Sequence, residues 1–475
     1  MISSLAWVPR GRAAAEPKEY VISEEERALA AQLEGARLSN VTKEGGASTL
    51  TEKLDMERYD DEDAMDAAAA EAMAANEDAT AGGDDDDVDS DAGDRKINPQ
   101  TDALLLAAVT EEDFSSIEVH VFDETNGSLF VHHDIALPAM PLSLAWVGAD
   151  NLSHVAVGTF LPLIEVWNLD VMDVLEPAMI LGGVQAGAPG ASQGGPELPG
   201  GMKLTTDAHT GAVMSLSWNR IVETALASGS ADHTVKVWDL STQKAVRTFE
   251  HHKDKVNCVL WHPVEESVLA SGSFDKTVRI LDSRMSPNDA IAASKSYSFS
   301  SDIESLVFNP HNPAQIVVAT EDGAIAAYDM RAGDSALFSF KAHSEAVSSL
   351  SFSSSVRGLL STASSDKTVR VWDYDALCKD PENKKHKWVA SKEMNVGQLF
   401  DCSFYGDSPF LLASAGSEGS IALWDCEENA KVEACFKGRV VDATSGVPES
   451  APAPPPAVPS KKKKKRGGKK KKKKN

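Results

Sequence analysis

Three sets of side chains along the chain combine a histidine, a hydroxyl residue and an aspartate, the residue types of a hydrolase triad. The first set is His209, Ser228 and Asp232. The other two sets are His252, Ser271 and Asp275, and His343, Thr362 and Asp366. Neither Ser228 nor Ser271 lies in a G-x-S-x-G nucleophile turn. Because the set recurs, it is typical of a repeated structural unit and not of a single active site, so we expect these residues to be structural.

Other enzyme chemistry finds no support in the sequence. The chain has no phosphate-binding loop and no zinc-ligand cluster. Its five cysteines form no C-x-x-C pair and suit a reducing compartment. No run of 18 apolar residues is present, so we expect no membrane span. The sequence therefore predicts a protein that is not an enzyme, with no cofactor, no metal and no small-molecule substrate.

Two short patterns recur along the chain and indicate the elements that position the polar residues. The first is an apolar strand, such as PLSLAW, that ends at an aromatic residue: Trp7, Trp146, Trp218, Trp261, Phe308, Phe352 and Phe404. The second is a strand that ends just before an Asp or Asn, at Phe122, Trp167, Trp238, Leu281, Tyr328, Trp372 and Trp424. Two independent series thus give seven repeats.

The spacing of the two patterns is nearly constant. The second follows the first by 20 or 21 residues in six repeats, but by 115 residues from Trp7 to Phe122. A third strand lies between them, as in TALASGS, and a fourth follows each Asp, as in KAVRTF. Four short antiparallel strands per repeat predict an all-β fold, a seven-bladed β-propeller. Residues 1–10 supply the first strand of blade one, and residues 101–440 supply the remainder.

The stretches LASGSADHTVKVWD (226–239), LASGSFDKTVRILD (269–282) and STASSDKTVRVWD (361–373) resemble the WD40 family. Blades of that family often share a network of His, Ser or Thr, Asp and Trp. The resemblance places this network on His209, Ser228, Asp232 and Trp238 in blade three, on His252, Ser271 and Asp275 in blade four, and on His343, Thr362, Asp366 and Trp372 in blade six. In blade four Leu281 replaces the tryptophan. A buried aspartate in a tight turn needs donors, which His N–H and backbone N–H groups supply.

Four further features resemble a branch of the WD40 family that acts in ribosome biogenesis. They are the opening MISSLAWVPRG, the acidic stretch after it, the run from EVWNLD to LEPAMILG within residues 157–182, and HTGAVMSLSWNR at 209–220. The resemblance implies a scaffold of the nucleus and nucleolus that acts in assembly or processing of large-subunit precursors. The implied partners are pre-ribosomal particles with their ribosomal proteins, assembly factors and pre-rRNA.

An acidic insertion separates the first strand of blade one from the rest of that blade. Residues 11–100 form this insertion, within a chain of formal net charge −26. Its densest acidic run is Asp84, Asp85, Asp86 and Asp87. Such a segment buries too little apolar surface to order itself, so we expect it to be largely disordered, with a short capped helix near 23–38. It is either a solubilising loop or a docking strip for histones or other basic proteins.

Residues 441–475 are predicted to be a Pro-rich linker and a disordered basic tail. Its cations are Lys461, Lys462, Lys463, Lys464, Lys465, Arg466, Lys469, Lys470, Lys471, Lys472, Lys473 and Lys474. Such a run is typical of nuclear or nucleolar targeting, of a contact with a nucleic-acid backbone, or of both. The tail has no aromatic residue, so we do not expect it to stack on bases.

One face of the predicted propeller carries the loops before each first strand and those between the second and third strands. Candidate exposed positions on it are Asp207, Lys253, Asp302, Ser344 and Met394, of which we expect Lys253 and Met394 to contact a partner. The insertion joins the first strand of blade one to the second. It should therefore leave from the opposite face.

Two other functions stay open at this point. A chromatin-binding regulator of rDNA transcription would use the acidic insertion to hold histones. A substrate receptor of a cullin-type ubiquitin ligase would carry a W-D-x-R pattern, which Leu281-Asp282-Ser283-Arg284 and Tyr328-Asp329-Met330-Arg331 resemble without the tryptophan.

Overall fold

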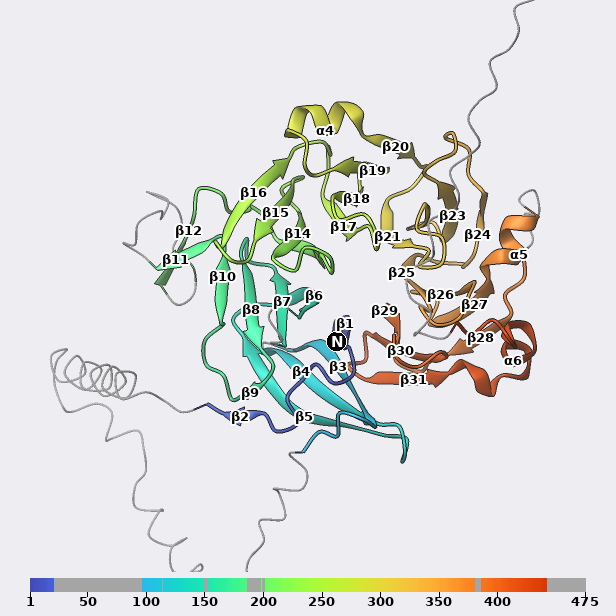
Figure 1. Ribbon diagram of the computed structural model, residues 1–475, viewed down its shortest axis with the longest axis horizontal. Helices are drawn as coiled ribbons and strands as arrows, with labels where there is room; N and C mark the ends of the chain where they lie inside the picture. Colours follow the sequence, from blue (N-terminus) through green and yellow to red (C-terminus); the bar gives the residue numbers. More distant parts are fainter. Residues whose placement is uncertain are drawn as a thin grey trace, which may run out of the picture. The chain divides into compact units, whose positions relative to one another are not determined.

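Seven antiparallel β-sheets surround a central axis in the computed structural model (Figure 1). The structure describes residues 1–20, 96–112, 114–148, 153–185, 198, 201–380 and 386–441. The first strand of each sheet is innermost, and each of these strands packs against the first strand of the next blade. The predicted seven-bladed β-propeller is therefore confirmed.

The strands follow one another through the blades in chain order, apart from short accessory strands. Blade one contains β1 (Ile2–Val8), β3 (Asp102–Glu111), β4 (Phe114–Asp123) and β5 (Ser128–Leu137), and blade two contains β6 (Pro141–Val147), β7 (His154–Thr159), β8 (Ile164–Asn168) and β10 (Met179–Leu181). Blade three contains β13 (Val213–Trp218), β14 (Ala225–Ser230), β15 (Val235–Asp239) and β16 (Lys244–Phe249). Blade four contains β17 (Val256–Trp261), β18 (Val268–Ser273), β19 (Thr277–Asp282) and β20 (Lys295–Ser298). Blade five contains β21 (Ile303–Phe308), β22 (Gln315–Thr320), β23 (Ala324–Asp329) and β24 (Phe338–Lys341). Blade six contains β25 (Val347–Phe352), β26 (Leu359–Ser364), β27 (Thr368–Asp373) and β28 (Ala390–Glu393). Blade seven contains β29 (Leu399–Phe404), β30 (Leu411–Gly416) and β31 (Ile421–Asp425).

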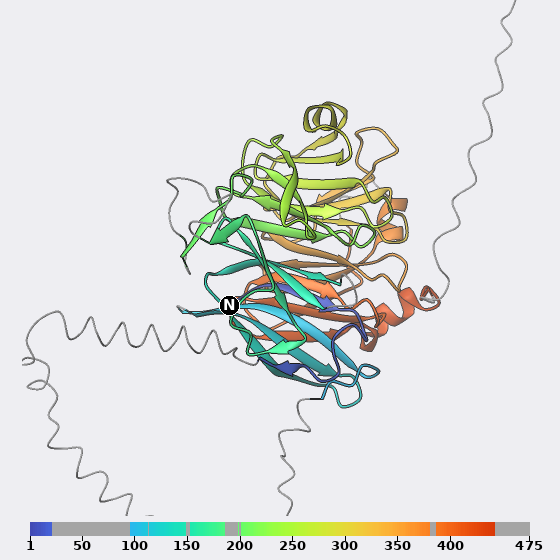
Figure 2. The ribbon, with the colours of Figure 1, turned by 60° about the vertical axis from the view of Figure 1, so that its left-hand side comes forward.

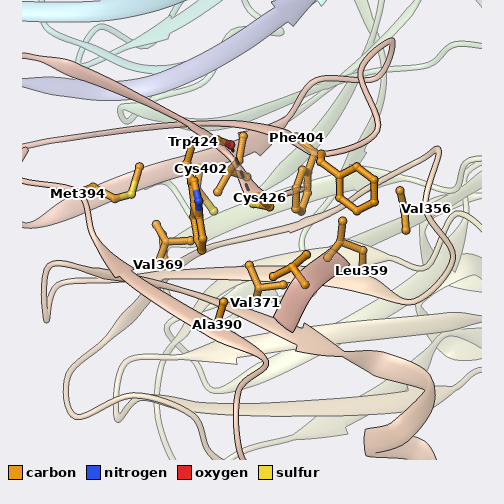
Figure 3. Packing of buried hydrophobic residues seen from close by; sticks show 14 of the residues in the cluster. Val356, Leu359, Val369, Val371, Ala390, Met394, Cys402, Phe404, Trp424 and Cys426 are labelled. Carbon is orange, nitrogen blue, oxygen red and sulfur yellow. Dashed lines mark hydrogen bonds between the residues drawn. The ribbon is translucent and has the colours of Figure 1, made fainter. Parts of the chain in front are cut away.

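Hydrophobic side chains between neighbouring blades form the core, because a single blade cannot bury both of its faces. Figure 3 shows one such layer, in which Val369 and Val371 of blade six lie near Cys402 and Trp424 of blade seven. Trp424 is 4% exposed. The aromatic residues of the second sequence pattern thus lie between blades, where burial of their large apolar surface stabilises the ring.

The N-terminal strand closes the ring. β1 pairs with β3, with Trp7 opposite Leu105, and the N-terminus lies at the centre of the disk beside β29 (Figure 1). The Trp7 ring packs on the Tyr405 ring of blade seven at 4.6 Å between centroids. The opening peptide thus forms the innermost strand of blade one.

The two ends of the insertion lie against the propeller. β2 (Lys18–Glu19) pairs in parallel with β9 (Val171–Met172), which precedes the last strand of blade two. Ile97 N–H donates to the Ala15 carbonyl at 2.9 Å, so the chain returns beside the point from which it leaves. Residues 21–95, with the predicted helix at 23–38, lie outside the described residues.

Blade seven departs from the prediction that a fourth strand follows each Asp. Within the described residues its sheet has three strands, and the chain after β31 forms the 3₁₀ helix η4 (Cys426–Glu428) and α6 (Ala430–Phe436). The side chain of Asn429 caps α6 by accepting from Lys431 N–H at 3.1 Å. Val432 and Phe436 are buried against blades six and seven, so a helix uses the apolar residues expected of a strand.

Three further elements interrupt the connections between strands. A hairpin of β11 (Gly183–Gln185) and β12 (Met202–Leu204) flanks the Gly/Pro-rich stretch before blade three. Helices α4 (Pro287–Ala293) and α5 (Tyr374–Lys379) precede the outer strands of blades four and six. These helices and α6 lie at the rim of the disk, as Figure 2 shows from the side.

Candidate functional site

The polar network of blade three joins four side chains in one hydrogen-bonded chain. Trp238 Nε1 donates to Ser228 Oγ at 2.8 Å, and His209 Nε2 lies 2.7 Å from the same oxygen. His209 Nδ1 lies 2.9 Å from Asp232 Oδ2. Because an indole only donates and a carboxylate only accepts, the chain has one direction: the serine donates to a neutral imidazole, which donates to the aspartate.

The turn between the second and third strands holds the aspartate in place. Thr234 N–H and its hydroxyl donate to Asp232 Oδ1 at 3.0 and 2.7 Å. His233, which lies between Asp232 and Thr234 in the sequence, has a φ of 70°, in the left-handed region that tight turns require. Lys276 and Lys367 have the same sign of φ in blades four and six. The carboxylate therefore fixes a turn in a conformation that most side chains disfavour.

Blade six repeats this geometry with a threonine in place of the serine. Trp372 Nε1 donates to Thr362 Oγ1 at 3.0 Å. His343 Nε2 lies 2.6 Å from Thr362 Oγ1, and its Nδ1 lies 3.0 Å from Asp366 Oδ2. Thr368 donates to the other carboxylate oxygen from its hydroxyl at 2.6 Å.

Blade four keeps the network although Leu281 replaces the tryptophan. His252 lies 2.8 Å from Ser271 Oγ through Nε2 and 3.0 Å from Asp275 Oδ2 through Nδ1. A second histidine, His251, approaches Ser271 Oγ with its Nε2 at 2.9 Å. His251 thus takes the position of the missing indole donor, a role that the sequence analysis missed although the pair HH at this point was visible.

In blades three and six, the electrostatics of the networks favour an ionised aspartate beside a neutral histidine. Burial alone would raise the pKa of Asp232, but hydrogen bonds from His209, Thr210 N–H and Thr234 outweigh it and hold the pKa well below its usual range. Burial lowers the pKa of His209, against the opposing effect of Asp232. His343 shows the same direction for the same reason. A buried histidine recurs at this position in three blades, and we propose that its role is to stabilise the turns.

The loops that carry these networks form one face of the disk, which is the candidate binding face. Lys253 and Ser344 are exposed there. Asp207 and Asp302 are half-buried: Asp207 accepts from Ala245 N–H at 2.8 Å, and Asp302 lies 4.0 Å from Lys276 Nζ. The prediction that Met394 is exposed is wrong.

Met394 is 5% exposed and packs in the core between blades six and seven (Figure 3). Its position in a loop suggested exposure, but its long apolar side chain fills a gap between the two blades. Met394 therefore offers no surface to a partner. The other predicted partner and targeting residues, Asp84 to Asp87 and the cations from Lys461 to Lys474, lie outside the described residues.

A second set of polar contacts, which the sequence analysis missed, joins the innermost strands of neighbouring blades. It uses the residue three positions before the aromatic residue of the first pattern. Leu144 N–H donates to Ser4 Oγ at 3.3 Å, Leu216 N–H to Ser143 Oγ at 3.1 Å, and Val259 N–H to Ser215 Oγ at 3.1 Å. Each bond links a blade to the next one along the chain.

The carboxylate of Asp401 completes this set where the ring closes. It accepts from Leu5 N–H of blade one at 2.8 Å and from Ser349 Oγ of blade six at 2.8 Å. Burial raises the pKa of Asp401, although these hydrogen bonds oppose the change. An aspartate thus stands in blade seven at the position where five other blades carry a serine, and it contacts both neighbouring blades.

The two W-D-x-R-like positions hold exposed ion pairs. Arg284 lies 2.7 Å from Asp282, and Arg331 lies 2.9 Å from Asp329. The arginine side chains are 70% and 66% exposed, so each is a surface group paired with the aspartate two residues before it.

The part of the chain that the structure describes contains no cluster of three or more metal-ligating side chains. In the same residues, every helix is too short or too polar to cross a bilayer.

Comparisons with known proteins place the fold in a family. A WD repeat-containing protein of Schizosaccharomyces pombe is 36% identical to this chain over 93% of the chain and 92% of that protein. The WD domain, G-beta repeat, family matches residues 201–239, and the family described as nucleolar protein 10-like, N-terminal domain, matches residues 226–418. The chain belongs to the WD-repeat family.

Two relatives make the resemblance more specific. Periodic tryptophan protein 1 of Saccharomyces cerevisiae is 28% identical over 95% of this chain and 92% of that protein. Its Drosophila melanogaster homologue is 29% identical over 70% of this chain and 69% of that protein. This WD-repeat chain is thus homologous to periodic tryptophan protein 1 across nearly its whole length. A shorter match, 45% identical over 12% of this chain, is to the ribosome biogenesis protein WDR12 homolog of Trichoplax adhaerens, of which it covers 13%.

Proposed function

We propose that this WD-repeat protein is a non-enzymatic scaffold that assembles or processes large-subunit precursors in the nucleolus. The carrying observation is its homology to periodic tryptophan protein 1, together with the matches to a nucleolar protein domain and to a ribosome biogenesis protein. A closed ring of blades, with loops on two faces, supports it because such a disk can hold two partners in a fixed relation.

The charged segments fit this function. A basic tail with 12 cations and an acidic insertion lie in one chain, and ribosome precursors contain both anionic RNA and cationic proteins. The insertion joins β1 to β3, so it leaves from the side of the disk opposite to the histidine networks. Partners on the network face and on the insertion would therefore not compete for the same surface.

Sedimentation of cell extracts tests the proposal. The tagged full-length chain should sediment on a sucrose gradient with large-subunit precursor particles and carry their rRNA. Sedimentation with nucleosomes or free histones would instead favour the chromatin function, and sedimentation as a free protein under conditions that keep precursors intact would contradict both.

The basic tail is proposed to target the chain to the nucleolus, and imaging separates that role from RNA binding. Removal of residues 461–475 should reduce nucleolar enrichment of the tagged chain. If enrichment persists while RNA affinity falls and loses its steep dependence on salt, the tail contacts RNA and targeting lies elsewhere. Cytosolic residence of the full-length chain would count against the ribosomal function.

A further inference from the structure

Blade seven ends in a strand whose outer edge has no partner among the described residues. β31 pairs with β30, and no other described strand pairs with it. In blade three the corresponding strand, β15, pairs on both sides, with Val237 opposite Arg247 of β16. Leu423 of β31 corresponds to Val237 of β15. Each of the two directly precedes a tryptophan, and that tryptophan lies opposite a leucine in the second strand of its blade.

The direction of the backbone groups follows from the alternation of an antiparallel pair. Cys426 N–H donates to the Phe410 carbonyl at 3.0 Å, toward β30. Two and four residues earlier, Trp424 and Ala422 face β30 in the same way. The N–H and C=O groups of Leu423 and Ile421 therefore point outward, where blade three has a fourth strand and the described part of blade seven has none.

The side chains of β31 show the same deficit. Val235, Lys236, Val237 and Trp238 of β15 are all buried. In β31 only Trp424 is buried, while Ile421, Ala422 and Leu423 are half-buried. Both the backbone and the apolar side chains of this strand thus lack the cover that a fourth strand gives, and an open edge of this kind is a template for strand addition.

The charge around the edge selects the chemistry of an added strand. Residues 399–429 of blade seven contain no Lys, Arg or His. Exposed carboxylates lie at both ends of β31, with Glu418 before it and Asp425, Glu427 and Glu428 at and after its end. On the blade-six side, Lys392 lies over the Trp424 ring at 5.5 Å. The edge is therefore a strand-shaped surface that is apolar at its centre and acidic at its ends.

We propose that β31 binds an extended basic segment of a partner protein, which adds as the fourth strand of blade seven. The main chain of that segment pairs with Ile421 and Leu423, its aliphatic or β-branched side chains cover their apolar surface, and its Lys or Arg side chains lie by the carboxylates at the ends. This binding mode goes beyond the proposed function, because it holds for any partner with such a segment.

Binding of a synthetic peptide to the purified full-length chain tests the mode. The probe is a fluorescein-labelled peptide in which Lys alternates with Val, and its control carries N-methyl groups on the amides that would face β31. Fluorescence anisotropy should show binding of the probe and about tenfold or greater loss for the methylated peptide, because several strand-pairing bonds are removed. Equal affinity for the two peptides would overturn the proposal.

A pair of variants localises the site. Leu423→Lys places a charge on the proposed edge and should weaken binding about tenfold or more. Val246→Lys is the matched control, since Val246 is 50% exposed on β16, the outer strand of blade three, and it should bind as the natural chain does. Equal loss in both variants would overturn the assignment to β31.

Hydrogen exchange gives a readout that does not depend on a variant folding. The amides of Ile421 and Leu423 should exchange fast in the free full-length chain and slowly with the Lys/Val peptide bound. If they are already protected, and lose protection when residues 441–475 are removed, the tail of the chain fills the edge and the proposal is wrong. These experiments use purified protein, so their failure leaves the ribosomal function standing, and the sedimentation experiment can fail without affecting them.

Discussion

At the scale of single residues, the histidines and aspartates of blades three, four and six satisfy one another in the way that buried polar groups require. Each carboxylate receives donors from a histidine, a backbone amide and a threonine of its turn, as Asp366 does from His343, Thr368 N–H and the Thr368 hydroxyl. We propose a structural role for these trios, because the histidine and the hydroxyl residue at their centre, such as His209 and Ser228, are fully buried and offer no surface to a substrate.

Removal of one carboxylate should expose the cost of stranded donors. Asp366→Ala is expected to reduce the free energy of unfolding by about 1–3 kcal/mol or more, as measured by denaturant or thermal unfolding. Asp334→Ala, at an exposed position, is the control and should change it by less than about 0.5 kcal/mol. Equal stability of the two variants would refute the proposed role of the network in blade six.

A buried glutamate outside the networks predicts a dependence of stability on pH. Glu165 is 4% exposed, accepts from Trp167 Nε1 at 3.2 Å, and has its pKa raised by burial to about 7. A raised pKa in the folded state means that its contribution is fully present below the unfolded pKa, about 4.3, and is lost as the pH rises through about 7.

Glu165→Gln should therefore raise the melting temperature relative to the natural chain near pH 8, and this gain should shrink toward about pH 4.5. Glu393→Gln, at an exposed position of β28, is the control and should show no such gain. A gain for Glu165→Gln that is independent of pH would show that packing, and not ionisation, is responsible.

At the level of strands and blades, neighbouring blades are joined by polar side chains that do not belong to the histidine networks. Ser4, Ser143 and Ser215 each accept a backbone N–H from the next blade. Asp401 differs because it receives donors from two neighbouring blades at the junction where blade seven meets blade one. We infer that this junction depends on Asp401, since among the described strands none is exchanged between blades one and seven.

The two junction types can be compared by a matched pair of variants. Asp401→Ala removes an acceptor shared by Leu5 N–H, Ser349 and Cys402 N–H, whereas Ser143→Ala removes an acceptor for Leu216 N–H alone. Asp401→Ala should be the more destabilising by about 1–3 kcal/mol, with faster proteolysis of the N-terminal strand. Equal losses of stability would show that closure does not depend on the carboxylate.

The number of blades and the position of the first strand could be predicted from the sequence, because each aromatic pattern is local and its spacing is nearly constant. The contacts of Ser4 and Asp401 could not be predicted from the sequence, since the groups that they bind belong to other blades and come close only in the closed ring. The burial of Met394 could not be predicted either, because its position in a loop before a first strand favours exposure and the gap that it fills forms only between two packed blades. Helix α6 had a readable signal in Asn429 and the run AKVEACF, but the expectation of a fourth strand overrode it.

The propeller as a whole presents surfaces of different charge and shape on its two faces and at its rim. One face carries the turns of the histidine networks, the opposite side carries the exit of the acidic insertion, and the open edge of blade seven offers an acidic, strand-shaped surface at the rim. We propose that a scaffold with these surfaces holds basic protein segments while its tail binds RNA or a targeting receptor.

Depletion of the chain from cells tests its proposed role in large-subunit assembly, through the ratio of mature large-subunit to small-subunit rRNA after pulse labelling. A scaffold for large-subunit precursors predicts that this ratio falls while precursors of the large subunit accumulate, and that the natural chain restores both. An unchanged ratio after complete depletion would contradict the account.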